Sequence, residues 1–426
     1  MAMLRSASEM KDSGIEWVGQ IPTDWHISKL KYLGTYINGF AFKPSDWSGK
    51  GKPIIRIQDL TGSNNGEPNY YNGKLESKYL VSSGDILVSW AATLDAFVWN
   101  NGEGWLNQHI FKAIPVNTID KHYYLWLLKV AMDNMNNDNK HGIVMQHVTT
   151  GVFNNYQVPL APRTEQHIIA NYLDNRCSKI DEIIGEATAS IEEYKELKQA
   201  VIFETVTKGY HKKSSLNYSL DWCDTGICNE WDVLQIRYLY RLRNERNEKP
   251  LKEVNLISLY TDKGVVQHAD LDKTTGNKAV TADGYKLVYP EDIIVNIILC
   301  WMGAMGRCEY YGVTSPAYDI YEPTDLERVC SRYYHYLFRT DRFAGKCYTL
   351  GRGIMMMRWR TYSSEFKSIK VPVPPYSEQV AIADYLDKRI RDMDALIFEK
   401  QVLIDDLQAY KKSLIYEIVT GKRRVV

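Results

Sequence analysis

The sequence lacks any apolar stretch long enough to cross a membrane. None of its 426 residues lies in a run approaching the ~20 apolar residues that a spanning helix requires. Residues 1–25 also lack the apolar segment of a signal peptide. The longest apolar run, residues 293–305, is interrupted by Asn296 and by glycines, and predicts a buried strand. These absences predict a cytoplasmic protein without a membrane-embedded part.

Cysteines are few, and none has the spacing of a metal or disulfide framework. There are seven, an odd number, and they are scattered along the chain. Cys223 and Cys228 are too far apart for a CxxC pair, and no second pair follows to complete a zinc site. We therefore expect reduced, mostly buried thiols and no metal.

Catalytic and cofactor motifs are also missing. The segment VPPY at 373–376 resembles an amino-methyltransferase motif, but Val373 offers no oxygen to hold a target amino group, and no glycine-rich S-adenosylmethionine loop accompanies it. The segment GSNNGEP from Gly62 lacks the Gly-Lys-Ser/Thr ending of a P-loop. The sequence therefore predicts a non-catalytic protein that binds no cofactor of its own.

The chain has no excess of charge of either sign, with 52 basic and 52 acidic residues. Phosphate contacts normally demand a basic excess, so a protein that wraps DNA unaided is disfavoured. Either the basic residues are segregated on the surface, or a partner supplies much of the positive charge. The length itself predicts two to four folded units.

An internal repeat organises the whole sequence. EQHIIANYLDNR begins at Glu165 and EQVAIADYLDKR at Glu378, and the match continues without a gap for over forty residues at an offset of 213. The preceding segments repeat more loosely, as in WHISKLKYL at Trp25 and WDVLQIRYL at Trp231, where the offset is 206. The chain therefore alternates globular and helical segments, each occurring twice.

The two repeated tails have the apolar spacing of long helices that pair with a partner. Apolar residues recur at alternating steps of four and three, the period of a coiled-coil seam. Thr164 and Ser377 are predicted N-caps, and Gly209 and Gly421 predicted helix ends. Each helix of about 43 residues would be ~65 Å long. The seam positions that we single out are Ile180, Ile184, Ile191, Tyr194, Met393, Ile397, Ile404 and Leu407.

These features predict an α+β protein with a pseudo-twofold internal repeat. The expected order is a globular domain at 14–164, a helix at 165–209, a second globular domain at 210–377 and a second helix at 378–422. Because the two apolar stripes are nearly identical, we expect the helices to pair with each other as an antiparallel coiled coil. The alternative is that each helix packs on its own domain.

The junction and its duplication resemble the specificity subunits of type I restriction-modification systems. The resemblance rests on two globular units, each ending in (V)PxxPxxEQxxIAxYLD and followed by a long helix ending in VTxG or VTG, and it covers essentially the whole chain. It implies that each globular unit is a target-recognition domain for one half of a bipartite DNA site. It also implies that the helices set the distance between the half-sites. One departure is Ala161-Pro162-Arg163, where the second junction has Pro374-Pro375-Tyr376.

The resemblance also implies the partners. They are double-stranded DNA, two methyltransferase subunits and, through them, restriction and translocase subunits. S-adenosylmethionine, ATP and Mg²⁺ are expected on those partners and not on this chain. A structural coiled-coil adaptor and a stand-alone DNA methyltransferase are the alternative functions. The adaptor does not explain two diverged globular units, and the methyltransferase lacks its cofactor loop.

Candidate DNA-contacting residues follow from the chemistry of base and phosphate recognition. That chemistry calls for Arg, Lys, Asn and Gln on loops. The candidates flank glycine-rich or charged loops in both globular units. They are Lys43, Lys50, Lys52, Arg56, Lys140 and Gln146 in the first, and Arg243, Arg246, Lys249, Arg352, Arg358 and Arg360 in the second.

Overall fold

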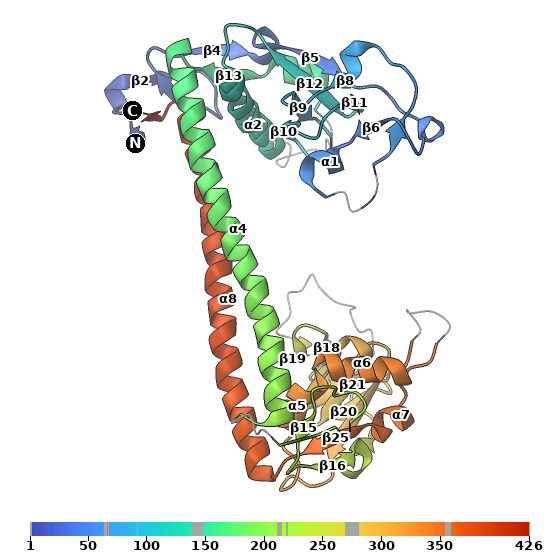
Figure 1. Ribbon diagram of the computed structural model, residues 1–426. Coiled ribbons are helices and arrows are strands. Elements are labelled where there is room, and N and C mark those ends of the chain that lie inside the picture. Colours follow the sequence, from blue (N-terminus) through green and yellow to red (C-terminus); the bar gives the residue numbers. More distant parts are fainter. Residues whose placement is uncertain are drawn as a thin grey trace. The chain divides into compact units, whose positions relative to one another are not determined.

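Two long helices belong to both of the units into which the contacts divide the chain (Figure 1). The computed structural model describes residues 2–63, 66, 68–91, 93–138, 148–210, 215–218, 220–268, 281–353 and 359–425. Unit 1 comprises residues 1–187 and 403–426, and unit 2 comprises residues 188–402. The boundaries fall inside α4 (Arg163–Lys208) and α8 (Tyr376–Val419). Each unit therefore contains the first part of one helix and the last part of the other.

Unit 1 is built on two four-stranded sheets, with strand orders β10-β9-β12-β5 and β7-β6-β11-β8, and on smaller two-stranded pairs. Its strands are β1 (Ala2–Leu4), β2 (Met10–Asp12), β3 (Gln20–Pro22), β4 (His26–Lys29), β5 (Gly34–Asn38), β6 (Lys52–Ile55), β7 (Tyr70–Tyr71), β8 (Leu80–Val81), β9 (Ile86–Ser89), β10 (Asp95–Val98), β11 (Gly104–Leu106), β12 (Ile110–Pro115), β13 (Gln157–Leu160) and β26 (Arg423–Val425). Its shorter helices are α1 (Ile57–Thr61), α2 (Lys121–Asp138) and α3 (Thr150–Asn155).

Unit 2 contains a four-stranded sheet of order β17-β24-β21-β22 and several two-stranded pairs. Its strands are β14 (Leu216–Asn217), β15 (Ile227–Cys228), β16 (Asp232–Gln235), β17 (Tyr240–Arg243), β18 (Ile257–Tyr260), β19 (Gly264–Gln267), β20 (Lys286–Val288), β21 (Ile293–Asn296), β22 (Met305–Arg307), β23 (Gly312–Thr314), β24 (Tyr318–Pro323) and β25 (Lys370–Val373). Its shorter helices are α5 (Ser331–Phe338), α6 (Asp341–Leu350) and α7 (Ser363–Ser368).

The two units share one sheet topology. Replacing β5, β9, β10 and β12 by β17, β21, β22 and β24 converts the strand order of the first sheet into that of the second. The strand that precedes each long helix is antiparallel to an early strand of its unit, since β13 pairs with β4 and β25 with β16. The predicted α+β class and the predicted duplication of the globular unit are confirmed.

Each hydrophobic core takes in the start of one long helix and the end of the other. In unit 1, Leu173 near the start of α4 and Ile418 near the end of α8 are fully buried in one cluster with the sheet. In unit 2, Val206 near the end of α4 and Leu386 near the start of α8 do the same. A long amphipathic helix must bury its apolar stripe, and here its ends are buried by globular cores.

The helix starts differ from the prediction. α4 begins at Arg163 and α8 at Tyr376, so Thr164 and Ser377 lie inside the first turn and the prediction that they are N-caps was wrong. The carbonyls of Pro162 and Pro375 accept the first helical hydrogen bonds, from the backbone N–H groups of Gln166 and Gln379. Proline fits this place because its fixed φ is compatible with a helix start and it has no N–H to satisfy.

The helix ends match the prediction. Gly209 and Gly421 directly follow the last turns and have φ values of 77° and 75°. Their N–H groups donate to the carbonyls of Thr205 and Ile418. A left-handed residue after the last turn is the common C-terminal motif of helices, and glycine adopts it without a Cβ penalty.

The apolar run at 293–305 is not a single strand, which corrects the prediction. β21 ends at Asn296, whose side-chain oxygen accepts hydrogen bonds from the N–H groups of Ile298 and Leu299. A short 3-10 helix (Cys300–Met302) follows, and Gly303 with φ 80° ends it. Asparagine stops the strand because its side chain offers the backbone a turn that competes with the sheet.

The predicted seam residues lie on the inward faces of the two long helices. Ile180, Ile191, Met393 and Ile404 are buried, and Ile184, Tyr194, Ile397 and Leu407 are half-buried. Two lysines that interrupt the apolar spacing reach a carboxylate on the other helix within the same unit. Lys411 pairs with Asp181 in unit 1, and Lys198 pairs with Asp394 in unit 2, each at 2.6 Å. Within each unit, the segments of α4 and α8 therefore lie side by side.

Candidate DNA-recognition surfaces

The candidate residues of unit 1 lie around β6 and the loop before it. Lys43 and Lys50 are exposed. Lys52 is half-buried and forms an ion pair with Glu103 at 2.6 Å, and Arg56 lies over the Trp47 ring at 5.2 Å. Lys140 and Gln146 lie outside the described residues. Unit 1 thus places one candidate cation, Arg56, beside an exposed tryptophan.

In unit 2, one candidate arginine is held in a carboxylate cluster. Arg243 is 13% exposed and forms ion pairs with Glu245, Asp292 and Glu322 at 2.7 to 3.0 Å. Burial raises the pKa of Asp292 to about 6, although the hydrogen bond and charge of Arg243 oppose this shift. The guanidinium of Arg243 is therefore engaged within the fold and is less available for DNA than that of an exposed arginine.

Two other candidates of unit 2 line one pocket. Arg246 and Lys249 are exposed and border a pocket of about 510 Å³ together with Asn255 and Tyr311. One guanidinium nitrogen of Arg246 donates to the carbonyl of Gly284 at 2.7 Å, which leaves its other donors toward solvent. The pocket therefore offers cations, an amide and a phenol ring, which can contact bases and phosphates, together with the carboxylates of Glu248 and Glu253.

The last candidates follow α6 along the chain. The backbones of Arg352 and Arg360 pair as an isolated antiparallel bridge, and both side chains are exposed. Arg352 also forms an ion pair with Glu365 at 2.7 Å. Arg358 lies outside the described residues. The backbones of the two arginines are therefore close in space.

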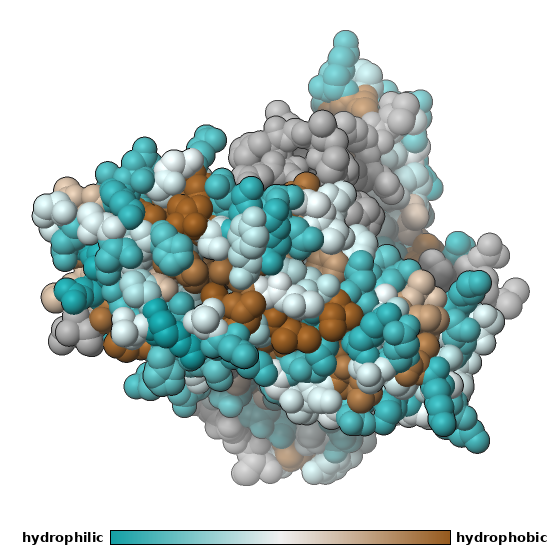
Figure 2. Space-filling view, turned by 90° about the horizontal axis from the view of Figure 1, so that it is seen from above, coloured by the Kyte–Doolittle hydropathy of each residue, from teal (hydrophilic) through white to brown (hydrophobic). Residues whose placement is uncertain are grey.

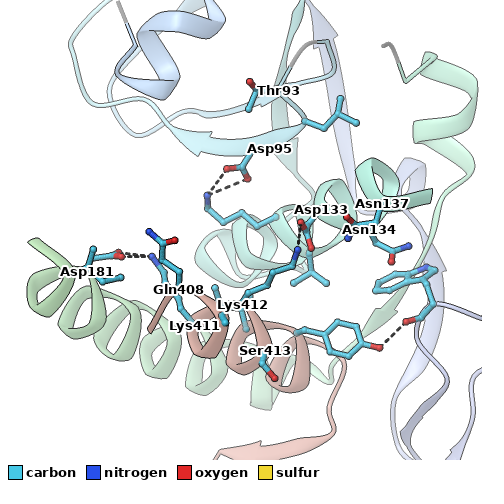
Figure 3. A pocket seen from close by; sticks show the side chains of 18 residues that line it. Thr93, Asp95, Asp133, Asn134, Asn137, Asp181, Gln408, Lys411, Lys412 and Ser413 are labelled. Atoms are coloured by element: carbon cyan, nitrogen blue, oxygen red, sulfur yellow. Dashed lines mark hydrogen bonds and ion pairs between the residues drawn. The ribbon is translucent and has the colours of Figure 1, made fainter. Parts of the chain in front are cut away.

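One pocket of unit 1 has a different character. Figure 3 shows its lining by α2, β10 and the two long helices, with a volume of about 940 Å³. Its lysines all have acidic partners, since Lys129 is near Asp95, Lys411 pairs with Asp181 and Lys412 pairs with Asp133. Its charges are thus matched within the fold, and it is not a candidate site for an anionic ligand.

Two buried glutamines form a connection that the sequence analysis missed. Gln166 is 3% exposed, donates to the carbonyl of Ala161 at 2.9 Å and accepts from the N–H of Asp120 at 2.8 Å. Asp120 directly precedes α2, so one side chain joins the start of α4 to the start of the domain helix.

Unit 2 has the same connection. Gln379 is 1% exposed, donates to the carbonyls of Pro374 and Arg328 at 2.9 and 3.1 Å, and accepts from the N–H of Cys330 at 2.9 Å. Cys330 is the residue before α5. The Glu-Gln pair repeated in both junctions was the available signal, but a polar residue in a first helical turn is usually exposed.

The surface seen in Figure 2 is largely hydrophilic, with apolar residues in a broken band bordered by hydrophilic ones. None of the described helices is long and apolar enough to cross a membrane. Among the described residues, no group of three or more His, Cys, Asp or Glu side chains is placed to hold a metal ion.

Comparisons with known proteins agree with this architecture. Residues 22–193 match the family model described as the type I restriction modification DNA specificity domain. The chain is 24% identical over 337 residues to the EcoBI specificity subunit of Escherichia coli, covering 78% of this chain and 57% of that protein. It is 23% identical to the MjaVIII specificity subunit of Methanocaldococcus jannaschii, covering 95% of this chain and 94% of that one.

Solved structures show the same fold. A chain from a structure describing complex assembly and conformational transition of a type I restriction-modification system superposes with a TM-score of 0.68, at 13% identity, covering 94% of this chain and 99% of that one. The HsdS subunit from Thermoanaerobacter tengcongensis gives 0.51, also at 13% identity, covering 94% and 98%.

Residues 22–193 are therefore similar to a DNA specificity domain of restriction-modification systems. Over nearly its whole length, the chain is similar to specificity subunits of type I systems. The resemblance to type I specificity subunits that the junctions indicate is thereby confirmed.

Proposed function

We propose that this chain reads a bipartite DNA target, with one half-site for each globular unit. The observation that carries the proposal is the duplication. Two units share a sheet order and the same glutamine connection to a long helix, yet their candidate DNA-contacting loops differ in sequence. Two copies of one scaffold with different loops suit the reading of two different sequences.

The two long helices are proposed to pair along their length as an antiparallel coiled coil that sets the distance between the half-sites. Support comes from equivalent ion pairs in the two units. Lys198 and Lys411 are related by the offset of 213 residues, as are their partners Asp394 and Asp181. The same lysine–aspartate ion pair between the two helices in each unit is the pattern expected of two helices related by a pseudo-twofold axis.

The helices are also proposed to dock two methyltransferase subunits, through which restriction and translocase subunits join. Each unit exposes related apolar side chains along them. In unit 1, Ile183 and Tyr410 are 45% and 52% exposed, and in unit 2 their equivalents at the 213 offset, Leu396 and Leu197, are 40% and 46% exposed. A contiguous patch of exposed apolar groups marks a contact with another protein, and the duplication of these positions fits two copies of one partner.

Tyrosines extend this exposed surface in each unit. Tyr210 stacks on Tyr385 in unit 2, with ring centroids 6.1 Å apart. In unit 1, Tyr172, the equivalent of Tyr385, lies under the guanidinium of Arg176 at 5.9 Å. Tyrosine and arginine are enriched at protein interfaces. The proposal leaves S-adenosylmethionine, ATP and Mg²⁺ to the partner subunits, and places the complex in the cytoplasm.

An exchange of recognition domains tests the function. Residues 14–164 would be replaced by the corresponding domain of another specificity subunit, and the methylated motif of the host would be sequenced. We expect one half of the motif to change and the other to stay. Loss or change of both halves together would contradict one half-site per unit, whereas an unchanged motif would support the structural-adaptor alternative.

A further inference from the structure

The loop that follows β5 has an equivalent after β17. At an offset of 206 residues, Asn38, Lys43 and Pro44 match Asn244, Lys249 and Pro250. The sheet register gives the same alignment independently. Gly34 at the start of β5 lies opposite Pro115, and Tyr240 at the start of β17 lies opposite Pro323. Lys43 and Lys249 therefore follow equivalent strands of the two sheets, each nine residues after the first residue of its strand.

The two loops also fix their lysines in similar ways. The backbone N–H of Lys43 donates to a carboxylate oxygen of Asp46 at 2.7 Å, and that of Lys249 donates to the amide oxygen of Asn247 at 3.1 Å. A short 3-10 helix follows each lysine, Pro44–Asp46 in unit 1 and Leu251–Glu253 in unit 2. The position of each lysine is thus set by local hydrogen bonds.

Both lysine side chains are exposed. Neither lysine forms an ion pair with a carboxylate among the described residues. Neighbouring lysines do, since Lys52 pairs with Glu103 and Lys286 with Asp319. An exposed ammonium group without a carboxylate partner keeps its counterions, and it can exchange them for a phosphate.

The surroundings of each lysine suit nucleic acid. Lys249 borders the pocket of Arg246, Asn255 and Tyr311, which Glu248 and Glu253 also line without forming an ion pair with Lys249 among the described residues. Lys43 follows Phe42, whose ring lies 5.4 Å from that of Tyr71. In both units, the unmatched cation stands beside groups that can contact sugar and base edges.

We propose that Lys43 and Lys249 are equivalent phosphate-binding residues, each contacting the DNA backbone beside the half-site of its own unit. The proposal rests on the proposed reading of DNA and adds a specific chemical contact to it. Because the two lysines leave equivalent strands, they would give both recognition domains the same register on the duplex. Base selection would then depend on the neighbouring residues, which differ.

The test measures DNA affinity against salt concentration. The full chain, assembled with its methyltransferase subunits, would be titrated with cognate and non-cognate duplexes between 50 and 200 mM KCl. Each phosphate contact contributes about 0.9 to the slope of log K against log salt. We expect Lys43→Ala and Lys249→Ala each to lower the slope by about 0.9, and the double variant by about 1.8, on both duplexes. The ratio of cognate to non-cognate affinity should stay unchanged.

A matched control is Lys78→Ala, which removes an exposed lysine that already pairs with Glu76, and its slope should equal that of the wild type. Wild-type slopes in both lysine variants would overturn the phosphate contacts while leaving DNA reading intact. A lowered slope in one variant alone would overturn their equivalence. If the wild-type complex does not prefer the cognate duplex, the proposed function fails, and this inference fails with it.

Discussion

Replacement of Gln379 by leucine should loosen the attachment of the second recognition domain to α8. Leucine has a similar volume but removes the acceptor of the Cys330 N–H and the donors to the carbonyls of Pro374 and Arg328. A buried polar group left without a partner costs about 1–3 kcal/mol. The added apolar side chain recovers about 1–2 kcal/mol. Two of the three groups, the Cys330 N–H and the Pro374 carbonyl, form buried hydrogen bonds. At about 2 kcal/mol for each unpaired group and about 1 kcal/mol recovered, we expect a net loss of about 3 kcal/mol in the local stability of this junction.

Amide hydrogen exchange measures this loss at the affected bond. The Cys330 N–H donates to the Gln379 side chain, so its protection reports on the connection itself. At 1.4 kcal/mol per factor of ten, protection should fall by a factor of about 100. Gln166→Leu should have a corresponding effect on the amide of Asp120, which Gln166 accepts at 2.8 Å in unit 1.

Gln199→Leu is the matched control, because Gln199 is an exposed residue of α4. It should leave the protection of Cys330 and Asp120 unchanged. If Gln379→Leu alters the exchange of Cys330 no more than this control does, the glutamine does not hold the domain to the helix. The reasoning from buried hydrogen bonds would then be refuted.

Two further predictions concern acid stability and the helices. Burial raises the folded-state pKa of Asp292 to about 6, above the ~3.9 of an unfolded aspartate, so this group makes the free energy of unfolding fall as pH rises from about 4 to 6. Burial also lowers the pKa of His335 to about 3, which makes that free energy rise with pH between about 3 and 6.5. Urea denaturation of Asp292→Asn should therefore show a steeper rise with pH from 4 to 6 than the wild type, and an unchanged slope would contradict this assignment. Seven residues inserted both near Ile191 and near Ile404 should lengthen the spacer by ~10 Å, from 1.5 Å per residue. Methylome sequencing should then find the same half-sites about three base pairs further apart, whereas an active variant with the original spacing would exclude the helices as the ruler.

The sequence predicted the features that depend on spacing within one segment. The repeat, the two long helices and their ends at Gly209 and Gly421 could be found because apolar periodicity and glycine conformation are local properties. The residue boundaries of the four predicted segments stay predictions. The contacts divide the chain differently, because each compact unit contains part of both long helices.

The features that the sequence did not predict depend on partners far along the chain. The glutamine connections link residues 46 to 51 positions apart, and Arg243 meets Asp292 across 49. No local pattern encodes these pairs. The N-caps were misassigned because Thr164 and Ser377 compete with the prolines before them, and the strand at 293–305 was drawn too long because Asn296 was read as a mere interruption. Which of the candidate cations contact DNA stays a prediction.

Comparison of the two units with each other separates attachment from recognition. The residues that attach a domain to a helix are the same in both, as with Gln166 and Gln379, and so are Lys43 and Lys249 at the sheet edge. At the same 206 offset, the residues around those lysines differ in chemical character. Phe40 corresponds to Arg246, and Trp47 to Glu253. The scaffold is the same in both units, while the loop residues change from aromatic to charged. This difference is expected if each unit contacts the DNA backbone in the same way and reads different bases.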